Sequence, residues 1–337
     1  MTSSNEIFEL WSDSQQDLIQ WLAPYMPTCV ALYRRIQFGH FTPDSRLLSS
    51  INFASPVHQT EANRPWIIAF VDRTCRPETE VWLSASWEHK VLANDSTRLP
   101  QEDDLVRSMV REIGKLKTPA RSENAAASSV RTNGNGSISN NHFERHLDNE
   151  NVALFGAVHS STAEILKSLG FIDPSFIGHD APYRKYIFDF KNSISSRSLP
   201  PGYVYGKVDP KDYELVKSRT QIPRQDRTLC QLPSVAIYYT DSQVSADEPI
   251  AWGFLGLDAS LTTLHVEPSH RGLGLAKSLS LKLFAGEMKA YGPDDPLVGG
   301  IVTHADVATD NVSSQRVCES LGGKWYFEVF WIRVSVV

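Results

Sequence analysis

The chain has 337 residues, of which 41% are hydrophobic and 21% charged, as is typical of a soluble globular protein long enough for two domains. The formal net charge of −6 and the lack of a lysine/arginine cluster argue against a nucleic-acid-binding surface. No apolar run reaches membrane-spanning length, and the first residues show no basic region followed by an apolar core, so we expect neither a membrane segment nor a secretory signal.

The first part of the chain reads as an α/β domain. Strands are expected at 66–71 and 80–87, followed by a helix over about 102–116. A polar stretch of small residues follows without periodicity, and it predicts a flexible insertion at about 119–145. Strand-like sequence resumes at 152–156, which places the insertion inside the first domain.

A second break divides the chain into two expected domains. Residues 193–202 are serine-rich and end in Pro200, Pro201 and Gly202, which indicates a linker. We therefore expect a first domain over 1–192 and a second over 203–337.

The second domain shows the order strand, two helices, three strands, helix, strand, helix, strand. Asp209 and Pro210 form a helix start, with Asp209 as N-cap and Pro210 at the first helical position. The other expected elements are strands at 203–208, 235–239, 250–257 and 261–266, a helical segment after 223, a helix over 272–291, a strand at 297–303, a helix at 313–321 and a strand at 325–334.

A weak internal repeat relates the two domains. Residues 164–171 precede a strand at 183–190, and the similar segment 316–323 precedes the strand that begins at Trp325. A pair of serines precedes each segment. This pattern suggests two copies of one domain, with chance similarity of short helix ends as the alternative.

The most informative segment is 263–276, which occurs only in the second copy. It reads as a strand that stops at Pro268 and turns through Gly272 and Gly274 into an amphipathic helix. The first amides of a helix have no intrahelical partner, and the helix dipole favours negative charge there. Arg271 adds a charged donor, so the segment predicts a site for a phosphate group.

The spacing of this turn narrows the ligand. It lacks the glycine that a phosphate-loop ATPase carries immediately before Lys277, and Lys277 occupies the place of the third glycine of a dinucleotide fingerprint. Arg271, Gly274 and Ala276 instead have the spacing of the acyl-CoA pyrophosphate loop, and the segment resembles that loop of the GNAT superfamily of N-acyltransferases. An ordinary strand-to-helix turn is the alternative reading.

The resemblance extends over residues 203–334. The segment 251–254 together with the glycine turn is similar to the glycine N-acyltransferase-like branch, and Asn311, Ser314 and Gly322 have the spacing of the superfamily's last helix. The resemblance implies an α/β (α+β layered) fold with two tandem GNAT-like domains, each a mixed central sheet flanked by helices, and a degenerate N-terminal copy.

The same resemblance implies acetyl-CoA or another acyl-CoA as donor, without a metal. Main-chain groups of Leu264 and Val266 are expected to hold the pantetheine arm, and a strand-edge amide near Val266 to polarise the thioester carbonyl. The expected donor-binding residues are Leu264, Val266, Arg271, Gly272, Leu273, Gly274, Leu275, Ala276, Asn311 and Ser314.

An amine acceptor needs a general base, because at neutral pH it is mostly protonated. The position of the glutamate that the glycine N-acyltransferases use falls on Ser260, which is no base. Asp258, His265 and His304 are the candidate substitutes, and His265 matches the required pKa best and lies on the strand expected to line the thioester. The alternatives are a turn residue for Asp258, a surface or packed residue for His265 and a loop cap for His304, which is expected to end its strand.

The general acid of the superfamily is a tyrosine seven residues after the asparagine that Asn311 matches. That position is Cys318 here, whose thiol could protonate the departing CoA thiolate. A buried helix cysteine is the alternative. The four cysteines are scattered without metal-ligand spacing, which predicts reduced thiols in a cytoplasmic protein.

The sequence therefore favours an acyl-CoA-dependent N-acyltransferase that transfers an acetyl group to the amine of a small molecule or amino acid. The expected partner is this small acceptor, without nucleic acid or membrane, and the chain is expected to be a monomer or homodimer. A CoA-binding or scaffold protein without turnover and a protein-lysine acetyltransferase are the alternatives, since Ser260 and Cys318 replace the residues expected for catalysis.

Overall fold

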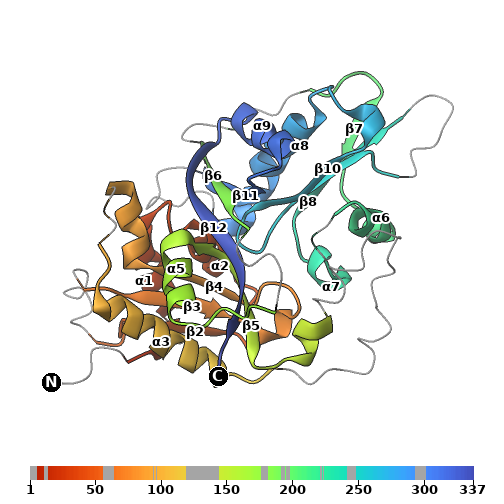
Figure 1. Ribbon diagram of the computed structural model, residues 1–337. Helices are drawn as coiled ribbons and strands as arrows, with labels where there is room; N and C mark the ends of the chain where they lie inside the picture. The colour runs from red at the N-terminus through yellow and green to blue at the C-terminus, as the bar shows by residue number, and fades with distance from the viewer. Residues whose placement is uncertain are drawn as a thin grey trace. The chain divides into compact units, whose positions relative to one another are not determined.

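The computed structural model describes residues 6–10, 14–55, 64–93, 95, 97–118, 144–175, 181–190, 194, 198–220, 222, 224–240, 248–292 and 301–337 (Figure 1). Nearly all of the expected insertion at 119–145 and much of the expected linker at 193–202 lie outside these ranges. The chain forms two compact units, one made of residues 1–183 and 327–337 and the other of residues 184–326. No helix in the described ranges is long and apolar enough to cross a bilayer.

The first unit is a mixed sheet with helices packed on it. Its strands follow the order β1-β2-β3-β4-β5-β12; β4 and β5 are parallel, and the other neighbouring pairs are antiparallel. The elements are β1 (Phe8–Leu10), α1 (Gln15–Leu22), α2 (Val30–Phe38), β2 (Arg46–Ser49), β3 (Ile67–Val71), β4 (Val81–Ala85), α3 (Pro100–Gly114), β5 (Val152–His159), α5 (Ser160–Ser168) and the greater part of β12 (Lys324–Ser335).

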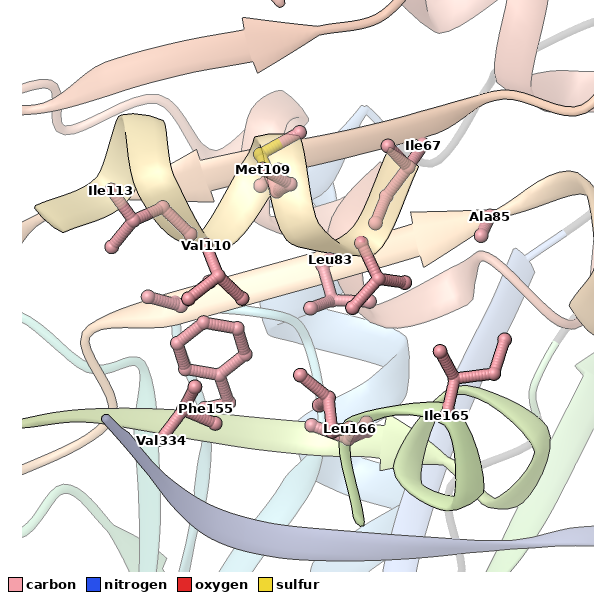
Figure 2. Packing of buried hydrophobic residues seen from close by; sticks show 14 of the residues in the cluster. Ile67, Leu83, Ala85, Met109, Val110, Ile113, Phe155, Ile165, Leu166 and Val334 are labelled. Carbon is pink, nitrogen blue, oxygen red and sulfur yellow. The ribbon is translucent and has the colours of Figure 1, made fainter. Parts of the chain in front are cut away.

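The core of this unit follows from the residue pattern. Strands β3 and β5 are continuous apolar runs and are buried along their whole length. Helix α3 turns an apolar stripe with helical spacing toward them, and Figure 2 shows this stripe packing beside the side chains of the strands and of α5. The labelled members of the cluster are Ile67, Leu83, Ala85, Met109, Val110, Ile113, Phe155, Ile165, Leu166 and Val334.

The second unit contains the expected glycine turn. Four antiparallel strands follow the order β7-β8-β9-β10, and β6 lies beside β11. The elements are β6 (Tyr183–Phe190), β7 (Tyr203–Gly206), α6 (Tyr213–Ser218), α7 (Asp226–Leu229), β8 (Ser234–Tyr239), β9 (Ala251–Leu255), β10 (Leu261–Val266), α8 (Leu275–Glu287), β11 (Ile301–Ala308) and α9 (Val312–Ser320).

Apart from 3₁₀ turns and the helical residues 144–148, the two halves of the chain repeat one order of elements. The series from β1 to β6 and the series from β7 to β12 both read strand, two helices, three strands, helix, strand, helix, strand. The predicted fold class, two α/β domains each with a sheet flanked by helices, is confirmed.

The last strand of each series lies in the unit of the other series. Strand β6 lies beside β11 in the second unit, and β12 pairs with β5 in the first. The units therefore divide the chain at 183/184 and 326/327, and not at the expected linker of 193–202. Composition locates a connection between elements, but it does not say which sheet a strand joins.

The expected elements of the second unit are present with shifted ends. Helix α8 begins at Leu275, because the preceding residues form the turn, and a 3₁₀ turn over Met288–Tyr291 completes the expected span. Strand β11 continues to Ala308, so His304 lies inside the strand and does not end it as expected. The added part of the strand contains the polar residues His304 and Asp306, which both contact Lys185 inside the unit.

Candidate functional site

Strand β10 carries a bulge in the middle of the candidate site. Thr262 pairs with Phe254 and His265 with Trp252, so β10 has one residue more than β9 over this stretch. Thr263 has φ of 53°, in the left-handed region that β-branched residues rarely adopt. A bulge bends a strand and redirects its edge, as bulges beside functional sites often do.

Strands β10 and β11 belong to separate sheets, but an isolated β-bridge connects them at one end. Ser260 and His304 form a parallel bridge just before β10, and beyond it the described residues show no ladder between the two strands. The edge that carries Leu264 and Val266 therefore lies past the point of separation. A strand edge of this kind can bind an extended chain through main-chain hydrogen bonds.

The glycine turn forms the N-terminus of α8. Gly272 and Gly274 have φ of 81° and 74°, and Gly274 is the N-cap of the helix. A Cβ at either position would meet no protein atom within 4 Å, so the space before the helix is open. The amides of the first turn, Leu275 to Lys277, have no intrahelical acceptor and point toward that space. The turn therefore has an open helix N-terminus, which is the geometry that anion binding at this position would need.

A recess of about 430 Å³ lies at this turn. Leu273, Gly274 and Ser278 form one part of its lining, and residues 198–200, at the end of the expected linker, form the rest. Arg271 is exposed, and its Nε donates to the carbonyl of Val266 at 2.9 Å, which ties the turn to the end of β10.

The residues at this turn fit the chemistry of an acyl-CoA. Helix amides and an arginine suit the diphosphate, and the main-chain edge of β10 suits the amide groups of the pantetheine arm. Asn311 uses its side chain to cap α9, accepting from the amide of Ser314 at 3.1 Å. The described residues contain no group of three or more histidine, cysteine or acidic side chains that could hold a metal.

His265 lies on the bulged strand next to the separation. Its ring stacks on Trp252 with centroids 4.7 Å apart, and 17% of its side chain is exposed. Burial lowers the pKa of His265, and the neighbouring charge of Glu267 offsets this only in part. The imidazole is therefore neutral at neutral pH, which is the form that accepts a proton.

Glu267 lies next to His265, and Arg219 in turn contacts Glu267. The Nε2 of His265 lies 3.6 Å from Oε1 of Glu267, which is longer than a hydrogen bond. Burial raises the pKa of Glu267, but its hydrogen bond of 2.8 Å from Nε of Arg219 and the arginine charge outweigh that effect and lower the pKa. An ionised Glu267 can orient the histidine and stabilise its protonated form.

Three of the catalytic candidates, Asp258, Ser260 and His304, lie close together and contact one another. The hydroxyl of Ser260 donates to Asp258 Oδ1 at 2.6 Å inside the turn before β10. His304 is fully buried, and its Nε2 donates to the carbonyl of Asp258 at 3.0 Å. This arrangement favours a structural role for these residues over the role of base.

Cys318 occupies the position expected for the general acid. Its side chain is 3% exposed, and burial, with the nearby carboxylates of Asp306 and Glu319, raises its pKa to about 12. Such a thiol is a poor proton donor to a departing thiolate, whose own pKa is about 8.5. The geometry favours the alternative of a packed helix cysteine.

We therefore expect Cys318 to be dispensable and unreactive. At pH 8, iodoacetamide should label the exposed Cys230 of the native protein and leave Cys318 unlabelled until the protein is unfolded. Cys318→Ala should keep the acyl-transfer rate of the wild type, with a loss of unfolding free energy of about 1 kcal/mol from the small void. Peptide mass spectrometry and initial rates check this, and rapid labelling of Cys318 or an inactive variant would contradict it.

Sequence reasoning missed four charged residues of the second unit. Lys185 and Asp306 are buried beside His304, and Arg219 and Glu267 lie beside His265. The sequence does contain a signal that could have identified Lys185 and Asp306, because a charged residue inside a mostly apolar strand needs a partner. The pairing itself depends on β6 lying beside β11, which the sequence does not indicate.

In the part that the structure describes, the first unit lacks this arrangement at the equivalent place. Helix α3 begins at Pro100 after Leu99, without glycines. Trp87 Nε1 donates to the hydroxyl of Thr162 at 2.9 Å, and that hydroxyl donates to Glu88 at 2.7 Å, so side chains connect the end of β4 to the start of α5. The features that suit an acyl-CoA are therefore those of the second unit.

The fold and a family match place the chain in the GNAT superfamily of N-acyltransferases. The family model for the acyl-CoA N-acyltransferase verG N-terminal domain matches residues 4–186, which is more than half of the chain. The chain belongs to this family of acyl-CoA N-acyltransferases. The match covers the first series of elements, and the glycine turn lies in the second.

Comparison with solved structures finds matches that cover nearly the whole chain. A Drosophila protein is 12% identical over 97% of this chain and 98% of its own, with a TM-score of 0.57. A GCN5-related N-acetyltransferase from Sphaerobacter thermophilus is 10% identical over 100% and 97% of the two chains, with a TM-score of 0.48. A tandem GNAT protein from the clavulanic acid biosynthesis pathway is 11% identical over 98% of both chains, with a TM-score of 0.43. Among curated proteins no match was found.

Proposed function

We propose that this protein transfers an acyl group, with acetyl as the first candidate, from acyl-CoA to the amine of a small molecule or amino acid. The observation that carries the proposal is the open glycine turn at the start of α8, next to the bulged edge of β10. One feature suits the diphosphate of the donor, and the other suits its pantetheine arm. Family membership supports the same reaction class.

The reaction is a direct transfer. The amine nitrogen attacks the thioester carbonyl carbon, the new C–N bond forms, and the C–S bond breaks to release the thiolate. Amines with a pKa of about 8–10 must first lose a proton. That first proton goes to solvent, and the attacking nitrogen sheds a second proton as the C–N bond forms. We assign this second proton to the imidazole of His265, which is neutral, partly exposed and on the strand beside the donor edge. An amide of the β10 edge polarises the carbonyl.

The residues between α6 and α7 support a small acceptor. Arg219 reaches Glu267, and Nη2 of Arg224 donates to the hydroxyl of Thr262 at 2.9 Å. Arg219 therefore contacts the residue just after β10, and Arg224 contacts β10 itself. The two contacted residues lie on opposite sides of His265 in the sequence. A base that is partly covered in this way suits a small amine better than the surface of a folded protein.

Acetyl-CoA is expected to stabilise the native protein against heat. At a hundred times its Kd, a ligand that binds only the folded state adds about 2.7 kcal/mol to the free energy of unfolding, which raises the Tm by several degrees. A thermal denaturation series with increasing acetyl-CoA measures the effect, and adenosine, which lacks the diphosphate, is the control. An unchanged Tm at millimolar acetyl-CoA would remove the basis of the proposal.

A CoA-binding protein without turnover is the second candidate function. Ser260 and Cys318 favour it, because the first is engaged with Asp258 and the second is a buried thiol. A thiol-release assay with a panel of small amines separates the two candidates. Binding of acetyl-CoA without release of CoA above the rate of hydrolysis would favour the second.

A further inference from the structure

A buried charged group in the second unit has no part in the chemistry described so far. Lys185 on β6 is 1% exposed, and its Nζ lies 2.8 Å from Oδ1 and 2.9 Å from Oδ2 of Asp306 on β11. The same Nζ lies 3.1 Å from Nδ1 of His304. A protein is strongly destabilised when a buried ammonium group loses its partner. The contacts of Lys185 with Asp306 and His304 therefore hold these three side chains together.

Hydrogen bonding fixes the orientation of His304. Its Nε2 faces the carbonyl of Asp258, which can only accept, so the proton is on Nε2. Nδ1 then accepts from the ammonium group of Lys185. Burial raises the pKa of Asp306, but the charge of Lys185 and the interactions with His304 together outweigh burial and lower it, so Asp306 is ionised and anchors the ammonium group.

The side chains of Lys185, Asp306 and His304 lie at the point where β10 and β11 separate. His304 forms the parallel bridge with Ser260 and holds the carbonyl of Asp258, and Thr303 donates to the carbonyl of Ala259. These contacts fasten β11 to the turn before β10. Past them the edge of β10 is open, and this is the edge proposed to bind the donor.

We propose that Lys185 is a positioning residue for acyl-CoA binding, which acts through Asp306 and His304 to set the separation of β10 from β11. The inference rests on the proposed function for the identity of the ligand. Lys185 lies before the expected linker, on the last strand of the first series of elements, so a residue of the first sequence copy completes the donor site of the second.

The test compares full-length variants in CoA binding by calorimetry and in steady-state kinetics. Lys185→Met should weaken CoA binding roughly tenfold and raise the KM for acetyl-CoA by a similar factor, with a smaller change in kcat. Lys211→Met, which replaces an exposed lysine of the same unit, should leave both values unchanged. Lys185→Arg, which keeps the charge, should recover part of the affinity.

A second readout reports the mechanism directly. Nitrogen NMR of the histidine rings should show His304 with its proton on Nε2 in the wild type, and a mixture of tautomers in Lys185→Met. If that variant does not fold, Lys185→Met combined with Asp306→Asn removes both buried charges and should show the same loss of CoA affinity.

Two negative results have different meanings. If a folded variant without Lys185 binds CoA within twofold of the wild type, Lys185 only stabilises the fold and the inference is wrong. If the wild-type protein itself binds no CoA, the proposed function fails, and the positioning role fails with it.

Discussion

Gly274→Leu is expected to weaken acetyl-CoA binding by about 100-fold or more. The φ of 74° and the absence of protein atoms within 4 Å show that a new side chain would point into the open space before α8. That space is where the diphosphate would meet the helix amides. Each charge-assisted hydrogen bond is worth about 1.5–3 kcal/mol, and the loss of 2.7 kcal/mol already corresponds to a factor of about 100 in Kd.

Gly170→Leu is the matched control for backbone strain. Gly170 follows α5 in the first unit with φ of 76°, and a Cβ there also meets nothing within 4 Å. A leucine in this conformation costs about 1–2 kcal/mol of stability at either position. Only Gly274→Leu should lose CoA affinity in calorimetry. An equal loss in both variants, or tight binding by Gly274→Leu, would show that the turn does not hold the donor.

The glycine turn could be found from the sequence because its signal is local. A strand that ends at a proline, two glycines and an amphipathic helix determine their geometry within about a dozen residues. The bulge at Thr263 had no such signal. A β-branched residue with positive φ goes against its local preference, and only the pairing of β10 with β9 shows that it occurs.

The position of His304 depends on contacts that are distant in sequence. Its strand was expected to stop at residue 303, but it continues through His304 and Asp306, two polar residues in a buried strand. Lys185 satisfies both groups, yet it lies more than a hundred residues away and on a strand that the chain order assigns to the other domain. The sequence does not predict that β6 and β12 each lie in the unit of the other series, because either sheet offers each strand an apolar neighbour.

The catalytic candidates show the same limit. Matching the family pattern places Ser260 and Cys318 at the expected positions, but only the structure shows that Ser260 is engaged with Asp258 and that Cys318 is buried. His265 was one of several candidates in the sequence. Its stacking on Trp252 and the proximity of Glu267 distinguish it from the others.

His265→Gln is expected to lower kcat by about 10²- to 10⁴-fold, the range for loss of a general base, while the Kd for acetyl-CoA stays unchanged. Glutamine keeps a polar side chain beside Trp252 but cannot accept the proton. Calorimetry and the thiol-release assay measure the two quantities separately. His40→Gln is the control, because His40 also stacks on an aromatic ring, that of Phe38, with centroids 4.4 Å apart.

The pH dependence gives the stricter test of this role. A general base works in its deprotonated form, so the wild-type rate should fall as the pH drops through the pKa of His265. Because burial lowers that pKa from 6.5, the acidic limb should lie below pH 6.5. The limb should be absent from His265→Gln, whereas the rise toward alkaline pH, which reports deprotonation of the amine, should remain in both proteins. An acidic limb that survives in His265→Gln would assign the proton to another group. Glu267, which is ionised and 3.6 Å from His265, would then be the next residue to test by substitution.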